Sequence, residues 1–312
     1  MKRVLVTGGS GFIASSLIPY LHQKGFQIWA SYHTRARKFP FPVHWAKTDL
    51  TRIQETLKLV REARPHFIFH LAGQARPAAS WDRPDSTLKL NVIGSLFLLE
   101  GMVKHAPRAR AVFLSSAQVY GMTFFKKKRV REEDPAVPAS PYAGSKLLME
   151  MAALNFVKRH NLWVVIARAF NHVGTGQSGG FVFSDFCRQI ALMEKGKKPP
   201  VLNAGNIDVV RDFIPLADAV RAYLLLAQRG QRGGIYNVGT GRGTLIRDAL
   251  RLLAGESRVP FRIRRIFSRV PKMDFPQAVG DPSKLKRLGW HPREPLKNTL
   301  RELLSDWREK VI

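Results

Sequence analysis

The sequence predicts a doubly wound α/β fold, in which helices cover both faces of a parallel sheet, joined to a second, smaller domain. Short apolar strands alternate with helical segments through the first half of the chain, which is typical of parallel sheets covered on both faces. The first strand runs into a glycine-rich turn and then a helix. With 312 residues, 45% of them hydrophobic, the chain is long enough to bury such a core.

The predicted elements follow one another in a regular order until Asn171. Beyond that residue, Gly- and Pro-rich stretches loosen the pattern, so we expect the second domain to begin there. We expect strands at 2–7, 27–31, 66–70, 110–115, 163–168, 235–238 and near 261–266, with long helices near 87–105, 142–159 and 296–310 and a return to the sheet from 215 to 228. The predicted domains interleave, with 1–170 plus about 212–238 as the dinucleotide-binding domain and about 171–211 plus 239–312 as the substrate-binding domain.

The turn after the first strand has the sequence Gly8-Gly-Ser-Gly11-Phe12-Ile13-Ala14. Glycines allow a ligand to approach the backbone closely, and the N-terminus of the following helix offers free N–H groups and a partial positive charge. Ala14 stands at the third glycine position, where a small residue permits close helix–strand packing. The motif therefore predicts a site for a dinucleotide pyrophosphate, with Gly8, Gly11, Phe12 and Ile13 contacting the cofactor.

Tyr142 and Lys146 form the most informative pair of polar residues. They lie four residues apart in a segment that begins with Ser140 and Pro141, and residues at this spacing share one face of a helix. A nearby cation lowers the pKa of a phenol, so we expect Lys146 to lower the pKa of Tyr142. Such a tyrosine can give or take a proton at a sugar hydroxyl or carbonyl.

Composition limits the class of protein. The single cysteine, Cys187, cannot form an internal disulfide, and we expect it to be a core residue in a reducing, cytoplasmic setting. Met1-Lys-Arg leads directly into a strand, so we expect no signal peptide. We also expect no apolar stretch long enough to span a membrane. Cys187 lacks partners spaced as metal ligands, so we expect no metal site. The net charge of +28 suits anionic ligands. No recognisable nucleic-acid-binding motif accompanies it, and we expect the densest run, Lys126–Arg129, to be a solvated loop.

These motifs together resemble the extended short-chain dehydrogenase/reductase family of nucleotide-sugar epimerases, dehydratases and reductases. The resemblance covers nearly the whole chain and includes the structural asparagine Asn91 and the segments 168–177 and 210–213. It implies that Ser116, Tyr142 and Lys146 are catalytic, with Tyr142 and Lys146 also contacting the cofactor. It further implies cofactor contacts at Asp49, Leu50, Leu71 and Ala72, and a homodimer that packs two long helices from each subunit.

The end of the second strand predicts which nicotinamide cofactor is used. An acidic residue there would hold the ribose 2′-hydroxyl of NAD. This chain instead has Ser31-Tyr-His-Thr-Arg35-Ala-Arg37, with no acid. Arg35 or Arg37 can pair with a 2′-phosphate, because the guanidinium group matches phosphate geometry. The sequence therefore favours NADP, with NAD as the alternative.

The residues after Ser116 separate the reactions of the family. Its dehydratases carry acidic residues there, whereas this chain has Ala117 and Gln118, which cannot act as acid or base. The resemblance is greatest to reductases of GDP-linked 4-keto-6-deoxy sugars, which convert GDP-4-dehydro-6-deoxy-D-mannose to GDP-D-rhamnose. It implies that Ser116, Asn171 and Arg211 bind the sugar nucleotide. A second phosphate-binding cation is displaced, with Arg269 or Lys272 as the candidate.

Three alternatives remain open from the sequence. A nucleotide-sugar 4-epimerase would use the same serine, tyrosine and lysine but retain a tightly bound NAD. A 4,6-dehydratase is less consistent with Ala117 and Gln118. A non-catalytic nucleotide- or RNA-binding protein built on this fold is suggested only by the positive charge.

Overall fold

The structure, a computed structural model, describes residues 1–266 and 274–311. Within these residues, one sheet contains seven parallel strands. The strand order reverses beside β1, and in doubly wound folds such a reversal opens a crevice at the carboxyl ends of the strands. From one edge to the other, the strands are β10 (Ile235–Val238), β6 (Trp163–Ala169), β5 (Arg110–Ser116), β4 (Phe67–His70), β1 (Arg3–Thr7), β2 (Gln27–Tyr32) and β3 (His44–Lys47).

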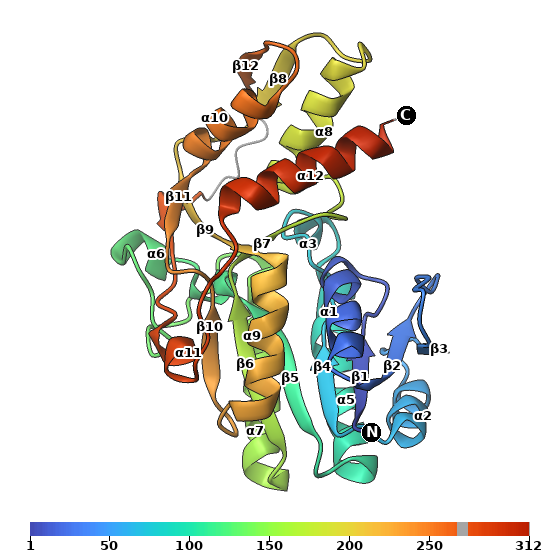
Figure 1. Ribbon diagram of the computed structural model, residues 1–312. Helices are drawn as coiled ribbons and strands as arrows, with labels where there is room; N and C mark the ends of the chain where they lie inside the picture. Colours follow the sequence, from blue (N-terminus) through green and yellow to red (C-terminus); the bar gives the residue numbers. More distant parts are fainter. Residues whose placement is uncertain (267–273, 312) are drawn as a thin grey trace.

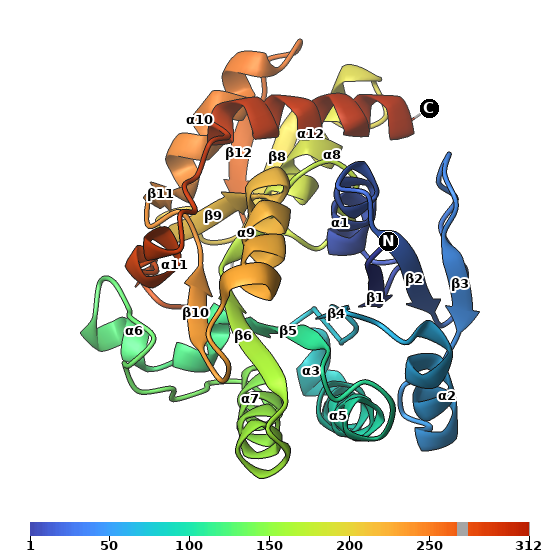
Figure 2. The ribbon, with the colours of Figure 1, turned by 60° about the horizontal axis from the view of Figure 1, so that its bottom comes forward.

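Helices cover both faces of this sheet (Figure 2). α1 (Phe12–Gln23) and α9 (Leu216–Arg229) pack on one face and bury side chains against β1, β4, β5 and β6. α2 (Ile53–Ala63), α5 (Gly94–His105) and α7 (Pro141–His160) pack on the other face. The predicted doubly wound α/β fold is therefore confirmed.

A smaller set of elements lies over the carboxyl ends of the strands (Figure 1). Its core is formed largely by α8, α10 and α12. β9 pairs with β7, β11 and β13, while β8 pairs with β12. The elements are β7 (Asn171–Val173), α8 (Val182–Glu194), β8 (Val201–Ala204), β9 (Val210–Pro215), β11 (Gly243–Leu245), α10 (Ile246–Glu256), β12 (Arg262–Arg265), β13 (Gln277–Ala278) and α12 (Leu296–Lys310). The short helix α11 (Ser283–Arg287) instead packs beside β10, with Leu285 in the core of the large sheet.

The helix expected at 87–105 is longer and less regular than the sequence indicates. It begins with α4 (Pro84–Leu88), passes through a π-helical turn at Lys89–Ile93 and continues as α5. We expected no apolar stretch of membrane-spanning length, and this expectation is wrong. The helix Pro84–His105 has 22 residues and a mean hydropathy of 1.3 over its most apolar window, so it is long and apolar enough by length and composition alone. This helix packs against α2 and α7, as helices of soluble cores do.

A buried ion pair fixes α7 against the sheet. Arg168 on β6 donates to both carboxylate oxygens of Glu150 on α7, with Nη2 2.8 Å from Oε2. Ser115 on β5 donates to the same carboxylate. The two charged side chains are only 5% and 2% exposed. Burial by itself would lower the pKa of Arg168, but the hydrogen bonds and charge of Glu150 raise it.

We predict that Glu150→Gln destabilises the protein by about 3–5 kcal/mol, because a buried arginine loses its counter-charge. The matched control is Glu302→Gln on α12, where the side chain is exposed and forms no recorded ion pair within the described residues. Its free energy of unfolding should change by less than about 0.5 kcal/mol. Urea denaturation measures both values, and equal losses in the two variants would contradict the assigned role of the buried pair.

Candidate active site

The glycine turn between β1 and α1 is shaped to receive a phosphate group. Gly8 has a φ of +69°, and a Cβ there would lie 2.8 Å from the backbone of Ala72. The helix begins at Phe12 after Gly11, and neither a side-chain cap nor an acidic residue occupies its first turn. The first N–H groups of α1 are therefore available to an anion. This arrangement fits the pyrophosphate of a dinucleotide, as expected for Gly8, Gly11, Phe12 and Ile13.

A buried polar chain holds the loop after β4 beside this turn. Both ring nitrogens of His70 form hydrogen bonds. Nδ1 lies 2.7 Å from Thr7 Oγ1, and Nε2 lies 2.8 Å from Ser95 Oγ. Burial lowers the pKa of His70 to about 3, so the ring is neutral at ordinary pH. Thr7 Oγ1 also accepts from the backbone N–H of Ala72 at 3.3 Å. Leu71 and Ala72 are thereby held against the glycine turn.

Asn91 connects the same loop to α7. Its Oδ1 accepts from the backbone N–H of Gln74 at 2.8 Å, and its Nδ2 donates to Ser145 Oγ at 2.9 Å. A Cβ on Gly73 would lie 2.8 Å from Asn91 Oδ1 and 3.3 Å from Lys146 Nζ. The π-helical turn positions Asn91 for these contacts, so the irregularity in the helix places a structural side chain.

Tyr142 and Ser116 meet where α7 crosses the end of β5. The Ser140 hydroxyl caps α7 by accepting from the backbone N–H of Ala143, which starts the helix immediately before Tyr142. The Ser116 side chain lies close enough to the Tyr142 phenol to lower its pKa, and both side chains are buried. Ser116 is the last residue of β5, and its Oγ also accepts from the backbone N–H of Gln118 at 3.2 Å. The two hydroxyl groups are thus held together by separate elements.

The direction of the pKa shift at Tyr142 differs from the sequence expectation. Burial raises the pKa of the phenol, and the Ser116 side chain offsets this only in part. Lys146 does not reverse the shift, because it is itself buried and its Nζ donates to the carbonyl oxygen of Leu114 at 2.8 Å. The phenol is therefore protonated at neutral pH, the state that a proton donor requires.

Lys146 lies one helical turn from Tyr142 and one turn from Glu150, on the same face of α7. Burial lowers the pKa of Lys146 to about 8, and the charge of Glu150 opposes that shift. Its ammonium group is therefore mainly charged at neutral pH and loses its proton as the pH rises through about 8. Glu150 was not among the predicted site residues, although an acid four residues after Lys146 was a visible signal.

The arginines expected to recognise a 2′-phosphate follow β2. The backbone of Ser31 accepts from the N–H of Gly9 at 2.7 Å, so the end of β2 adjoins the glycine turn. Ser10 Oγ donates to the carbonyl oxygen of Arg35 at 2.6 Å, which brings the Arg35 segment to the same turn. Arg35 is exposed and Arg37 is half-buried, and neither side chain has a recorded partner within the described residues.

Asp49 and Leu50 follow β3 at the same edge of the sheet. Asp49 Oδ1 accepts from both the backbone N–H and the hydroxyl of Thr51. These hydrogen bonds lower the pKa of Asp49 against the opposing effect of burial. Leu50 is buried and packs beside Gly94 at the start of α5. The pair thus lies just past the carboxyl end of β3, where a contact with the cofactor is expected.

The expected substrate residues lie on β7 and β9, two strands that pair with each other. Asn171 is exposed, and its Nδ2 donates to the carbonyl oxygen of Asp212 at 3.0 Å. Arg211 pairs with Asp274 and donates to the carbonyl oxygen of Phe275 at 2.7 Å. Arg269 and Lys272, the candidates for a second phosphate contact, lie outside the described residues.

The structure also shows a polar pair that the sequence analysis assigned no role. His172 Nε2 hydrogen-bonds with the Tyr223 hydroxyl, which joins β7 to α9. Burial lowers the pKa of His172 to about 4 and raises that of Tyr223, and a charge on Tyr142 would raise the latter further. The pair is therefore neutral, and Tyr223 lies within electrostatic reach of Tyr142. Tyr223 gave no sequence signal, because its pairing with His172 depends on the packing of α9.

Asp212 plays a structural part beside Arg211. Its fully buried carboxylate accepts from the backbone N–H groups of Thr240 and Gly241, each at 2.9 Å, and from the Thr240 hydroxyl. These contacts join β9 to the loop after β10. Arg211 accordingly forms its ion pair with Asp274, while the adjacent Asp212 accepts hydrogen bonds from backbone N–H groups.

The arrangement can protonate a bound carbonyl oxygen. Tyr142 supplies an O–H group, Ser116 supplies a second donor, and the glycine turn of α1 can hold a dinucleotide nearby. No group of three or more His, Cys, Asp or Glu side chains within residues 1–266 and 274–311 is placed to hold a metal ion. Cys187 is buried on α8, and burial raises the pKa of its thiol, in keeping with a core residue.

Comparisons with known proteins agree with this geometry. GDP-6-deoxy-D-mannose reductase of Pseudomonas aeruginosa is 34% identical over 99% of this chain and 98% of its own length. The solved structure of RMD from the same organism, complexed with NADPH, has a TM-score of 0.87 at 33% identity, with both chains fully covered. UDP-glucose 4-epimerase of Thermotoga maritima, solved with UDP-glucose, has a TM-score of 0.88 at 27% identity over 99% of each chain.

The family model for the NAD dependent epimerase/dehydratase family matches residues 4–239, well over half of the chain. The glycine turn, Ser116, Tyr142 and Lys146 all lie within that match. The chain belongs to the NAD dependent epimerase/dehydratase family.

Proposed function

We propose that this protein is an NADPH-dependent reductase of the 4-keto group of a nucleotide-linked 6-deoxy sugar, GDP-4-dehydro-6-deoxy-D-mannose, which it converts to GDP-D-rhamnose. The observation that carries the proposal is the buried pair of hydroxyl groups on Ser116 and Tyr142, with neutral Ala117 and Gln118 beside them. The similarity to GDP-6-deoxy-D-mannose reductase over nearly the full length of both chains supports the substrate.

The chain's own residues bind the substrate and move one proton. Arg211 and Asn171 hold the sugar nucleotide, with Arg211 at the diphosphate, and Arg269 is the candidate for a further phosphate contact. Ser116 donates a hydrogen bond to the carbonyl oxygen, and Tyr142 donates the proton that converts this oxygen to a hydroxyl group. The bound nicotinamide supplies the hydride. Lys146 holds the nicotinamide ribose and keeps a positive charge beside the phenol.

The remaining assignments divide the chain by ligand. Residues 1–170 plus about 212–238 bind the cofactor, with contacts from the glycine turn, Asp49, Leu50, Leu71 and Ala72. Residues of about 171–211 plus 239–312 bind the sugar nucleotide. The position of this second part over the carboxyl ends of the strands supports the division (Figure 1).

The proposed homodimer packs α7 and the Pro84–His105 helix of each subunit as a four-helix bundle. Leu148 and Met151 lie on one face of α7 and are 47% and 54% exposed. Leu88 and Ile93 on the neighbouring helix are also exposed, and exposed apolar patches of this kind mark protein interfaces. We place the dimer in the cytoplasm, a setting in which the lone buried thiol of Cys187 stays reduced.

A nucleotide-sugar 4-epimerase is the second candidate, favoured by the likeness to UDP-glucose 4-epimerases. One of these, from Azospirillum brasilense, is 30% identical over 99% of this chain. The two activities differ in their use of the cofactor. A reductase consumes added NADPH, whereas an epimerase is purified with bound NAD and turns over without addition. Absorbance of the reduced nicotinamide, measured with a panel of nucleotide sugars and both cofactors, separates them.

We predict that Tyr142→Phe lowers kcat by roughly 100- to 10,000-fold, the usual contribution of a general acid. The dissociation constant for NADPH should change little, because the ring remains in place. Tyr20→Phe on α1 is the matched control and should retain normal turnover, since Tyr20 lies away from Ser116. Steady-state kinetics with NADPH titration measures both quantities. Near-normal turnover by Tyr142→Phe would exclude the phenol as the proton donor.

We predict that the protein prefers NADPH to NADH and that replacing Arg35 and Arg37 together with Ala narrows the preference. Each charge-assisted hydrogen bond to the 2′-phosphate contributes about 1.5–3 kcal/mol, so the ratio of kcat/KM values should fall at least tenfold. The fall should come from NADPH, with NADH kinetics unchanged. A wild-type preference for NADH, or an unchanged ratio in the double variant, would place the 2′-phosphate elsewhere.

We predict that Arg211→Ala raises KM for the sugar nucleotide by about one to two orders of magnitude, because a charge-assisted contact with the diphosphate is lost. KM for NADPH should change far less. Arg247→Ala is the control, because Arg247 also pairs with an aspartate, Asp208, but lies on α10. Arg211→Lys should restore only part of the affinity, since lysine lacks the bidentate fork. Equal reduction of the free sugar and its GDP form would refute a diphosphate contact.

A further inference from the structure

The end of the sheet opposite the crevice carries a large share of the positive charge. The N-terminal ends of the parallel strands meet at this end, and so do the C-terminal ends of α1, α2, α5, α7 and α9 (Figure 1). We call the surface that they form the basal face. It is made by the segments 2–3, 22–27, 61–67, 104–110, 158–163 and 228–235.

The basal face has far more cations than its helices require. It carries twelve Lys and Arg residues against a single acid, Glu62. A helix C-terminus has roughly half a negative charge, so five of them are balanced by two or three cations. The twelve are Lys2, Arg3, Lys24, Arg61, Arg64, Lys104, Arg108, Arg110, Lys158, Arg159, Arg229 and Arg232.

These cations are not neutralised within the molecule. In the part of the chain that the structure describes, none of the twelve forms an ion pair with a carboxylate. Their recorded contacts are with rings and neutral oxygens, as when Arg110 stacks 4.1 Å from the Trp163 ring and donates to Gln228. The run Lys126–Arg129 differs, because Lys127 pairs with Asp134.

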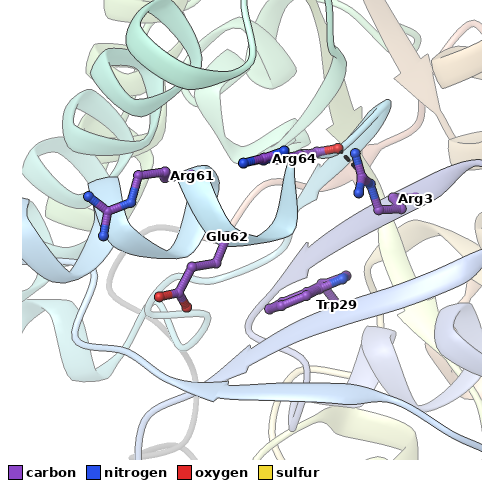
Figure 3. A pocket seen from close by; sticks show the side chains of 5 residues that line it. All are labelled: Arg3, Trp29, Arg61, Glu62 and Arg64. Atoms are coloured by element: carbon purple, nitrogen blue, oxygen red, sulfur yellow. Dashed lines mark hydrogen bonds between the residues drawn. The ribbon is translucent and has the colours of Figure 1, made fainter.

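A hollow of about 460 Å³ opens in the basal face (Figure 3). Arg61, Glu62 and Arg64 line it from the end of α2, and Arg3 and Trp29 line it from the strands. Trp29 Nε1 is the single buried side-chain nitrogen or oxygen that lacks a hydrogen-bond partner among the described residues. This buried donor lacks an acceptor, and it reaches a ligand in the hollow only after a neighbouring side chain shifts.

The surroundings of the hollow favour an anion as that acceptor. The guanidinium groups of Arg61 and Arg64 make no recorded contact within the described residues. Lys58 Nζ lies 3.9 Å from Glu62 Oε1, so the negative charge of Glu62 is partly compensated. Guanidinium groups are donors suited to phosphate oxygens, and Figure 3 shows that of Arg61 at the rim of the hollow, pointing away from Trp29. The hollow can therefore receive one phosphate group, while the surrounding cations face an array of them.

The geometry points to an anionic phospholipid membrane as the partner of the basal face, with a phosphate headgroup bound in the hollow beside Trp29. Cations from five helix ends lie on one end of the molecule, where they can face a plane of headgroups together. The basal face is less suited to single-stranded nucleic acid, because the bases of single strands bind by stacking on exposed aromatic rings. Here Lys2 covers Phe67 and Arg110 covers Trp163. Docking in this way leaves the crevice at the opposite end open to substrate.

The test is sedimentation of the full-length protein with vesicles. Wild-type protein should bind vesicles of equal parts phosphatidylcholine and phosphatidylglycerol at low salt, dissociate at high salt and ignore pure phosphatidylcholine. The basal variant carries Arg61→Gln, Lys104→Gln, Arg108→Gln and Arg159→Gln. Each cation near such a surface contributes on the order of fivefold in affinity, so its partition coefficient should fall by a hundredfold or more. Turnover should be unchanged, because none of the four contacts the crevice.

The control removes the same charge from the second part, with Arg251→Gln, Arg258→Gln, Arg262→Gln and Arg264→Gln on or beside α10 and β12. Its vesicle binding should fall less than about threefold, because screening limits the reach of charge. Trp29→Phe should weaken vesicle binding measurably while keeping the ring stacked on His44. Equal losses in the two charge variants would show that only net charge matters. Binding of RNA without binding of vesicles, lost in the basal variant, would overturn the membrane assignment.

Discussion

The buried ion pair between Glu150 and Arg168 is the interaction on which the geometry of the candidate site depends. Glu150 lies on the same face of α7 as Tyr142 and Lys146, so fixing its carboxylate fixes the rotation of the helix about its axis. Arg168 reaches it from β6 and Ser115 from β5. The pair thus ties the helix to two neighbouring strands of the seven-stranded sheet. A buried ion pair adds little net stability compared with an apolar packing, and its value here is the orientation that it imposes on the phenol.

The two ends of the sheet divide the electrostatic work of the molecule. At the carboxyl ends, the uncapped start of α1 and the arginines after β2 create positive potential where a dinucleotide is proposed to bind. At the opposite end, the helix C-termini are covered by cations well beyond those needed to offset the helix dipoles. The net charge of +28 is therefore directional. A large part of it lies away from the chemistry, where it can act on a partner without disturbing the catalytic groups.

Burial sets the protonation states within the crevice. His70 and His172 are neutral because desolvation lowers their pKa values to about 3 and about 4. The same effect raises the pKa of Tyr142 and lowers that of Lys146 to about 8. A protonated phenol beside an ammonium group that is mainly charged at neutral pH is suited to giving a proton to a carbonyl oxygen. The neutral residues Ala117 and Gln118 offer no second acid or base, which favours reduction over elimination on a scaffold that this family uses for several reactions.

The sequence by itself determined the fold class, the glycine turn and the spacing of Tyr142 and Lys146, because periodicity and short motifs are local properties of the chain. It also predicted most strands and the long helices to within a few residues. It could not determine the direction of the pKa shift at Tyr142, because that depends on how deeply α7 is buried and on which oxygen Lys146 contacts. Tertiary structure alone likewise decided two pairings, His172 with Tyr223 and Arg211 with Asp274. It also decided that cations gather at one end of the sheet. Each of these features joins residues that are distant in sequence. Such residues come together only when the strands take their order in the sheet and the helices pack on it.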